Sequence, residues 1–403
     1  MRTAPVHRIG AGARAARGRG MLNSVAEVHE PVLASAERLE VRVVDDERGF
    51  DGLRHDWNDV AARMEPSSPM LSWEWCRQWW RYFAGPNRLQ ILTFVRDGRM
   101  IGIAPFQERR AGIGPLALRV LKPIGWEDYG NQGMTEHLEL LFPPEHRSEL
   151  MARLAAWLAA NRVTSVWLPS IPEGEAMPRW LTENAVRQQP WVPFHYRELP
   201  SDWLAFVQGL NKSMRSNSRY YAKLLIRHGH SFELEVAHTP EDVLRALPAA
   251  VRLHRTRANA ADVSRVQHHD HFYRPDRVAF IEEMAPVLAA NGEFKVGLLL
   301  LDGEVVAAQM WFERANTLFL YYSGFEPAWA KYGVQLVTTL EVLKHCMSRG
   351  VKRVEFLRGG GQLKERWDSE SRVVRNILFA PNRAVTGALQ LGDRVRLRLR
   401  RLR

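Results

Sequence analysis

Two long runs of apolar residues in the sequence are each interrupted by an Asp-Gly pair. One is "ILTFVRDGRMIGIAPFQER", with Asp97-Gly98, and the other is "VGLLLLDGEVVAAQMWFER", with Asp302-Gly303. Asp-Gly between two such runs is typical of a β-hairpin, because both central residues of the turn need a positive φ. The segment ahead of each hairpin is predicted to be helical, over Trp73–Phe83 in the first case and Pro275–Ala290 in the second.

The order of elements after each hairpin is also similar. The first hairpin is followed by an irregular strand region, a helical pattern in "HRSELMARLAAWLAA" and a strand in "VTSVWLP". The second is followed by "TLFLYYSG", the helical pattern "VQLVTTLEVLKHCMSRG" and the strand "VKRVEFL". Apolar residues at 336, 337, 340, 343 and 347 follow the spacing of one buried helix face. We interpret residues 40–200 and 231–385 as two copies of one α/β unit with mixed sheets, joined by a basic helix at 201–230.

Composition places the chain among ordinary globular proteins. It has 403 residues, of which 46% are hydrophobic and 25% charged. No apolar run approaches the roughly 18 residues that a membrane-spanning helix needs, and the N-terminus lacks the apolar core of a secretory signal. Cys76 and Cys346 lie far apart in apolar contexts, as reduced core residues do. These observations predict a cytoplasmic protein.

The net charge of +11 is concentrated at the two ends of the chain. Residues 1–22 contain five Arg and no acid, and residues 391–403 contain six Arg and one Asp, so each end carries +5. The remaining residues, 23–390, are therefore close to neutral. A nucleic-acid partner is not expected, because such proteins carry a basic face on their folded part. We predict a disordered basic tail at 1–22 and a basic tail at 391–403, with weak membrane-surface contact as one open role for them.

The turn between "TLFLYYSG" and the next helical pattern is the first candidate for chemistry. A helix that starts after a glycine turn presents main-chain N–H groups without partners, and its dipole favours an anion there. The candidate donors are Gly333, Val334, Gln335 and Leu336, and no acid lies in the first turn to repel a phosphate. A plain strand-to-helix connection is the alternative.

Several motifs resemble a known family. They are "LHR" (253–255), "VVAAQMWF" (305–312), "YYSGFEPAWAKY" (321–332) and "VEFLRGGGQLKERW" (354–367), with "LSWEWCRQWW" (71–80), "IGIAPF" (101–106) and "LKPIGWEDYGN" (121–131) in the first half. Residues 254–367 resemble the GNAT-type acyltransferase domain of the CelD/BcsL-like family. That family is related to the Fem peptidyltransferases and is associated with exopolysaccharide and cellulose biosynthesis.

The resemblance implies two tandem GNAT-like folds and direct transfer from acyl-CoA, most simply acetyl-CoA, without a metal. It implies a small-molecule or saccharide acceptor between the halves, and donor binding at Gly333, Val334, Gln335 and Leu336. The expected acceptor-binding residues are Asp128, Tyr129, Arg215, His254, Gln309, Arg358, Lys364 and Trp367. The expected function is an N- or O-acyltransferase acting on a carbohydrate or cell-envelope precursor.

Two departures from the family pattern keep other functions open. Gly333-Val334-Gln335 stands where the family has Ser-Pro-Gly, and Gly359-Gly360-Gly361 stands where it has an acidic pair. The first departure retains a glycine in the turn. The second leaves open a non-catalytic component of a polysaccharide biosynthesis complex. A Fem-like aminoacyl transferase is the other alternative.

Two residues are candidates for acid–base catalysis. Glu355 lies in the apolar strand "VKRVEFL", where the first half has Trp167. A buried carboxylate must be paired or used, so Glu355 is either a general base or an ion-pair partner of Arg358 or Lys364. Tyr332 is either the general acid for the departing thiolate or a ring packed on the sheet.

The remaining candidates each have two interpretations. Lys364 would hold an acceptor phosphate or carboxylate or lie on the surface, and Trp367 would contact the acceptor or pack. Asp128 and Tyr129, in "GWEDYGN", would contact the acceptor or form a turn. "HHDH" (268–271) lacks the ligand spacing of a zinc site. The basic stripe of residues 212–227, which includes Arg215, would be a solvated face or a clamp for a phosphorylated ligand.

Overall fold

A mixed sheet is the centre of the structure, a computed structural model that describes residues 39–111, 118–127, 133–173, 181, 183–260, 269–359 and 362–391. These residues belong to one compact unit, Leu39–Arg403. The predicted tail at 1–22 and all of the tail at 391–403 beyond Leu391 lie outside the described residues, as do Asp128 and Tyr129.

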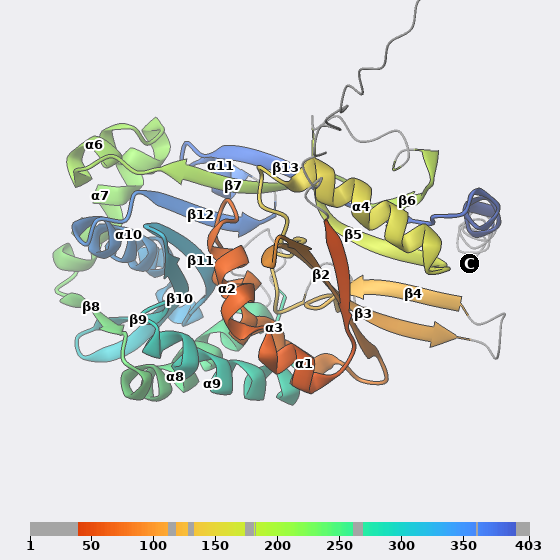
Figure 1. The fold of residues 1–403 in the computed structure, drawn as a ribbon. Coiled ribbons are helices and arrows are strands. Elements are labelled where there is room, and N and C mark those ends of the chain that lie inside the picture. Colours follow the sequence, from red (N-terminus) through yellow and green to blue (C-terminus); the bar gives the residue numbers. More distant parts are fainter. Residues whose placement is uncertain are drawn as a thin grey trace, which may run out of the picture. The chain divides into compact units, whose positions relative to one another are not determined.

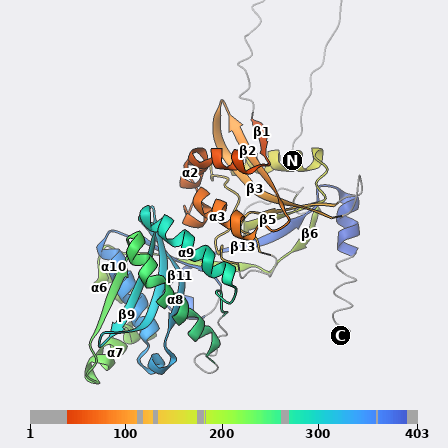
Figure 2. The same cartoon turned by 90° about the horizontal axis from the view of Figure 1, so that it is seen from below.

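The first half contains these elements: β1 (Glu40–Val44), α1 (Glu47–Gly52), α2 (Arg54–Ala62), α3 (Trp73–Phe83), β2 (Arg88–Arg96), β3 (Arg99–Ala111), β4 (Leu118–Pro123), α4 (Arg147–Ala160), β5 (Ser165–Pro172), β6 (Ala185–Gln188) and β7 (Val192–Glu198). The rest of the described chain contains α6 (Trp203–Gln208), α7 (Lys212–Arg227), β8 (Phe232–Ala237), α8 (Pro240–Asn259), α9 (Pro275–Ala290), β9 (Phe294–Leu301), β10 (Glu304–Arg314), β11 (Thr317–Phe325), α10 (Val334–Ser348), β12 (Arg353–Arg358), α11 (Gln362–Glu365) and β13 (Glu370–Phe379). Figures 1 and 2 show their arrangement.

The sheet repeats one arrangement. Its strand order is β1-β2-β3-β4-β5-β13-β7-β12-β11-β10-β9-β8. In the first half β2, β3 and β4 pair antiparallel and α4 crosses to β5, which pairs parallel with β4. In the second half β9, β10 and β11 pair antiparallel and α10 crosses to β12, which pairs parallel with β11. Both predicted Asp-Gly hairpins are confirmed, with φ of 49° and 78° at Asp97 and Gly98 and of 52° and 87° at Asp302 and Gly303.

The two halves exchange their closing strands at the middle of the sheet. β7, from the first half of the chain, pairs antiparallel with β12. β13, from the end of the chain, pairs antiparallel with β5. β7 and β13 also pair with each other. The sheet is therefore continuous from one half to the other, and hydrogen bonds of either half depend on a strand of the other.

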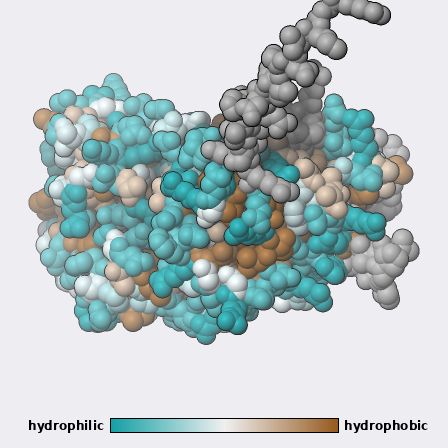
Figure 3. Space-filling model, viewed as in Figure 1, coloured by the Kyte–Doolittle hydropathy of each residue, from teal (hydrophilic) through white to brown (hydrophobic). Residues whose placement is uncertain are grey.

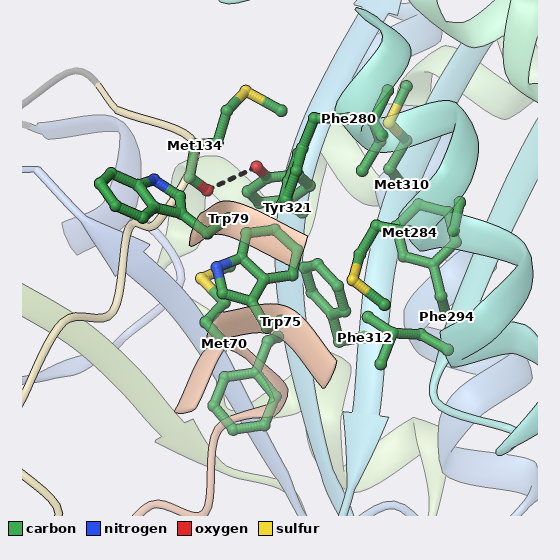
Figure 4. Close-up of a cluster of buried hydrophobic side chains, with 14 of the residues drawn as sticks. Met70, Trp75, Trp79, Met134, Phe280, Met284, Phe294, Met310, Phe312 and Tyr321 are labelled. Atoms are coloured by element: carbon green, nitrogen blue, oxygen red, sulfur yellow. Dashed lines mark hydrogen bonds between the residues drawn. The ribbon is translucent and has the colours of Figure 1, made fainter. Parts of the chain in front are cut away.

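Helices from both halves share one hydrophobic core. α3 packs on α9, and Trp75 stands edge-on to both Phe280 and Phe312 at 5.0 and 5.7 Å between ring centroids. Figure 4 shows this cluster, including the hydrogen bond from Tyr321 to the carbonyl of Met134. Burial of this many aromatic rings fixes the halves against each other. On the face drawn in Figure 3, hydrophilic side chains predominate and the larger hydrophobic area lies near the centre.

Both cysteines, Cys76 and Cys346, are buried and not joined to each other. In the described part of the chain, no helix is long and apolar enough to cross a membrane.

Candidate active site

A pocket of about 560 Å³ lies where β11 and β12 part. The two strands pair only from Thr317–Arg353 to Phe319–Glu355, although β11 continues to Phe325 and β12 to Arg358. Leu320, Tyr321, Tyr322 and Ser323 of β11 face the pocket from one side, and Phe356 and Arg358 of β12 from the other. Beyond these residues the two strands no longer pair with each other, which leaves space for a ligand between them.

A bulge in β11 forms one wall of the pocket. Gln309 pairs with Ser323 and Trp311 with Leu320, so two residues of β11, Tyr321 and Tyr322, stand opposite one residue of β10. A bulge of this kind re-aims a side chain, and the two adjacent tyrosine rings stack at 3.8 Å instead of pointing to opposite faces. Burial raises the pKa of both phenols well above their ordinary range, so both are neutral.

The N-terminus of α10 borders the pocket. Gly333 is left-handed, with φ 59°, and a Cβ there would lie 2.7 Å from the ring of Tyr221 on α7. Its N–H donates to Ala330 O, and the N–H of Leu336 donates to Gly333 O. Of the four predicted donors, two already have acceptors. Only the N–H groups of Val334 and Gln335 are without a main-chain acceptor among the described residues.

This helix end has the properties of an anion site. Its first turn has no acidic residue, and no side chain caps it. Two N–H groups at a helix N-terminus, aided by the helix dipole, suit a phosphate oxygen.

The structure brings nine of the predicted site residues to this pocket. They are Gly333, Val334, Gln335, Leu336, His254, Gln309, Arg358, Lys364 and Trp367. It does not bring Glu355, Tyr332 or Arg215 there. Asp128 and Tyr129 lie outside the described residues.

Glu355 is an ion-pair partner and not a pocket residue. Its carboxylate accepts from Arg353 at 2.7 Å and lies 3.7 Å from Arg372, and its side chain is 1% exposed. Its neighbour across the parallel pair is Phe319, the last residue before the strands part. The geometry therefore favours the ion-pair interpretation, although the partners are Arg353 and Arg372 and not the expected Arg358 or Lys364.

Tyr332 and Arg215 also point elsewhere. The short 3₁₀ segment Pro327–Tyr332 directs Ala330 toward the pocket, while the buried Tyr332 hydroxyl contacts His228 Nδ1 at 3.1 Å. Arg215 lies on the exposed face of α7 and donates to Leu210 O. Neither is placed to touch a ligand in this pocket.

Lys364 lines the pocket, but its ammonium group is already bound. Its Nζ donates to the carbonyls of Phe356, Leu357 and Arg358 at 2.6, 2.9 and 2.6 Å. These carbonyls converge because Leu357 has a φ of 56°. Burial lowers the pKa of Lys364 to about 8. Lys364 is thus neither a surface residue nor a free phosphate ligand, since it holds the end of β12 in shape.

His254, Gln309 and Trp367 are built into the walls. His254 Nδ1 donates to Ser323 O at 3.1 Å and Nε2 accepts from the N–H of His271, and burial lowers the pKa of the ring, so it is neutral. Gln309 spans the bulge by donating to the carbonyls of Met310 and Tyr322. Trp367 stacks on Phe356 at 5.6 Å, which agrees with the packing interpretation.

The "HHDH" stretch contributes to the pocket through His269 and His271, whereas His268 lies outside the described residues. His271 stacks on Tyr322 at 4.4 Å, and its Nδ1 lies 3.2 Å from the Tyr322 hydroxyl. Within the described residues, no group of three or more His, Cys, Asp or Glu is arranged to hold a metal ion.

Among the described residues that line the pocket, Glu136 carries the carboxylate, and the sequence analysis did not identify it. It comes from the first half of the chain and lines the pocket with Arg358 and Lys364. Burial raises the pKa of Glu136, and the charges of Lys364 and Arg358, with a hydrogen bond from the Arg358 main chain, oppose that rise only in part. The feature that could have indicated Glu136 is its position in "GMTEHLELLF", where a carboxylate lies among residues of a buried segment.

A chain of contacts between the halves holds the segment that carries Glu136. The carbonyl of Met134 accepts from Tyr321 at 2.7 Å, and the N–H of Met134 donates to Glu127 at 2.9 Å. Glu127 in turn pairs with Arg277 of α9 at 2.6 Å, and both side chains are at most 5% exposed. Arg277 also donates to the carbonyl of His271. The buried ion pair between Glu127 and Arg277 therefore holds both the segment that carries Glu136 and the main chain of His271.

In the first half, the space that corresponds to the pocket, beyond the paired part of β4 and β5, is filled by other residues of the chain. There β4 and β5 pair only at Val120–Ser165 and Leu121–Val166. Beyond this point the carbonyl of Leu138 accepts from Ser170 Oγ at 2.6 Å, and Leu141 pairs with Ile103 of β3. Leu138 and Leu141 belong to the segment 133–142, which also carries Glu136, and Leu141 is fully buried. The same segment that fills the first half presents Glu136 to the second.

Comparisons with known proteins agree with this geometry. Residues 212–365 match the family described as "Acetyltransferase (GNAT) domain". No curated protein matches the sequence.

Among solved structures, FemX is similar with a TM-score of 0.53 and 9% identity, over 84% of this chain and 98% of that one. A tandem GNAT protein from the clavulanic acid biosynthesis pathway has a TM-score of 0.44 and 11% identity, over 85% and 99% of the two chains. The C-terminal domain of a putative lysylphosphatidylglycerol synthetase from Agrobacterium fabrum has a TM-score of 0.47 and 11% identity, over 84% and 95%. At such identities the likeness to FemX concerns the fold alone.

The predicted fold class, mixed α/β with two tandem GNAT-like folds, is confirmed, because residues 212–365 match the GNAT domain and the first half repeats its strand order. The finer resemblance to the CelD/BcsL-like family stays a prediction. Residues 212–365 match the model of a GNAT acetyltransferase domain, and this match supports an acyltransferase activity.

Proposed function

We propose that the protein transfers an acyl group, most simply acetyl, from acyl-CoA to an amine or hydroxyl of a carbohydrate or cell-envelope precursor. The observation that carries this proposal is the pocket between the parted strands β11 and β12, which ends at the free N–H groups of Val334 and Gln335. CoA is a long molecule in which a pyrophosphate joins a nucleotide to a pantetheine arm that contains two amides. The start of α10 offers N–H donors for the pyrophosphate, and the gap between β11 and β12 offers room for the arm.

The fit runs from one end of the pocket to the other. The pyrophosphate would lie at the N-terminus of α10, where Val334 and Gln335 donate. The arm would lie between β11 and β12, where the two strands no longer pair with each other. The thioester would then reach the wall formed by Tyr322 and Glu136.

Glu136 is the group best placed to act as general base. The acceptor nitrogen or oxygen attacks the thioester carbonyl, a C–N or C–O bond forms, and the C–S bond breaks. Glu136 takes the proton that the acceptor loses and returns it to solvent, and CoA leaves as the thiolate, which takes one proton from solvent. A carboxylate whose pKa is raised toward neutrality is a better base for this step than an ordinary one.

The acceptor side of the pocket suits a sugar ring. His271 and Trp367 border the pocket with aromatic rings, and Glu136 and Arg358 border it with polar groups. The C–H faces of sugars pack on aromatic rings, while their hydroxyls need hydrogen-bond partners. The resemblance to the CelD/BcsL-like family supports the same class of acceptor and an exopolysaccharide context. Because acyl-CoA is a cytoplasmic metabolite, we place the reaction in the cytoplasm.

A Fem-like aminoacyl transferase is the second candidate, and the likeness in fold to FemX is the observation that favours it. A titration of the full chain with acetyl-CoA in a calorimeter separates the two. We expect one site per chain with a dissociation constant of about 1 μM to 1 mM, the usual range for enzyme substrates. The absence of any binding heat at millimolar acetyl-CoA would rule out the acyl-CoA donor.

A further inference from the structure

The outer face of α7 carries an unusual concentration of positive charge. The helix has 16 residues, five of them Lys or Arg and none of them acidic. The five cations are Lys212, Arg215, Arg219, Lys223 and Arg227, and all are exposed. Their spacing of three or four residues places them on one side of the helix. Residues 23–390 carry only +1 in total, so without these five cations the rest of the body is net acidic and this face is a local feature.

Nothing in the described structure neutralises this face. None of the five side chains has a carboxylate within ion-pair distance among the described residues, whereas exposed arginines elsewhere do, such as Arg245 with Asp242 and Arg252 with Glu326. A shallow hollow runs along the face, lined by Lys212, Arg215, Ser216, Arg219, Tyr220 and Lys223. Five like charges held together repel one another, so an anionic partner would relieve that repulsion.

Apolar side chains lie among these charges. Ile226 is 65% exposed and Tyr220 is 49% exposed, both on α7, and Leu204 of the neighbouring α6 is 59% exposed. A helix with cations and exposed apolar residues on one face is typical of segments that lie in the interface of an anionic bilayer. A nucleic acid would satisfy the charges, but it would leave Ile226 and Leu204 in water.

We propose that the outer face of α7 docks on an anionic lipid surface. The cations contact the headgroup phosphates, and Ile226, Tyr220 and Leu204 enter the boundary between headgroups and acyl chains. The opposite side of the same helix lines the pocket through Met214, Asn217 and Tyr221. Docking therefore places the pocket within about one helix diameter, roughly 10 Å, of the lipid headgroups. If the proposed acyl transfer holds, its acceptor is presented at the membrane surface.

The test is sedimentation of the full chain with vesicles of phosphatidylglycerol or of phosphatidylcholine. One variant combines Lys212→Glu, Arg219→Glu and Lys223→Glu. The matched control combines Arg48→Glu, Arg99→Glu and Arg153→Glu, three exposed arginines of the first half that form no ion pair with a described residue. Both variants change the charge equally and both keep the basic tails. Circular dichroism checks that both are folded.

We expect the wild type to bind phosphatidylglycerol vesicles, to ignore phosphatidylcholine and to lose binding at high salt. The α7 variant should bind about 100-fold more weakly, from about 1 kcal/mol for each cation near the surface, and the control should stay within about threefold of wild type. Equal binding of both variants would overturn the proposal. So would tighter, α7-dependent binding to an RNA oligonucleotide, or a loss of acetyl-CoA affinity in the α7 variant with vesicle binding retained. Acetyl-CoA titration of the wild type tests the proposed function separately.

Discussion

Replacing Glu136 with Gln is expected to lower turnover by roughly 10²–10⁴, the usual range for a positioned acid–base group. Gln keeps the size and polarity of the side chain but cannot accept the proton of the acceptor. The affinity for acetyl-CoA should be unchanged, because the proposed phosphate contacts lie at Val334 and Gln335. Release of the CoA thiol, followed with a thiol reagent, measures turnover, and calorimetry measures donor affinity.

The dependence of kcat/KM on pH is a second test of the role of Glu136. Glu136 acts as a base only when ionised, and burial raises its pKa above the ordinary value of 4.5. Therefore kcat/KM should rise with pH through that raised pKa, and Glu136→Gln should remove this acid limb. The matched control is Glu355→Gln, which breaks the buried pair with Arg353 and should reduce stability while turnover of the folded protein stays near wild type. The reverse result, with Glu355 essential for turnover and Glu136 dispensable, would overturn our assignment.

Substituting Gly324 by Val is expected to have the largest effect on stability. A Cβ at Gly324 would lie 2.2 Å from His254 N and 2.2 Å from Leu253 C, which are main-chain atoms of α8. Since a main chain cannot rotate away as a side chain can, α8 would have to move off β11. The loss should be about 4 kcal/mol or more, at the upper end for single substitutions. Chemical unfolding followed by tryptophan fluorescence measures it.

Gly387→Ala is the matched control for that experiment. Gly387 lies in a helical segment, and a Cβ there would meet nothing within 4 Å. Alanine should leave stability unchanged or raise it by up to about 1 kcal/mol, because glycine is a poor helix former. A folded Gly324→Val protein with wild-type stability would show that α8 does not rest on β11 as closely as described.

Local patterns in the sequence predicted the elements well. The Asp-Gly pairs at 97–98 and 302–303 place both hairpins, and the helices Trp73–Phe83 and Pro275–Ala290 have the predicted bounds. Each of these depends on residues that are close in sequence. The strand exchange between β7 and β13 depends on pairing over more than a hundred residues, and no local pattern indicates it.

The site was harder to predict for the same reason. The turn at Gly333 was located correctly because strand, glycine and helix are contiguous, but two of its four N–H groups are used by the turn itself. Glu355 was a reasonable candidate as a carboxylate in an apolar strand, yet Arg353, two residues away, satisfies it. Glu136 reaches the pocket from the other half, and the bulge that turns Tyr322 into the pocket is a property of strand pairing.

The most direct test of the donor site is calorimetry of acetyl-CoA with wild type, Gln335→Glu and Gln335→Lys, with S-acetylpantetheine, which lacks the pyrophosphate and the nucleotide, as the second ligand. A carboxylate in the first turn stabilises the helix but repels a phosphate, whereas an ammonium attracts it. We predict that Gln335→Glu weakens acetyl-CoA binding by about 10- to 100-fold, as expected for a like charge a few ångströms away. Gln335→Lys should bind at least as tightly as wild type, and S-acetylpantetheine should bind all three proteins alike. Equal affinity of all three proteins for acetyl-CoA would contradict the placement of the pyrophosphate at the start of α10.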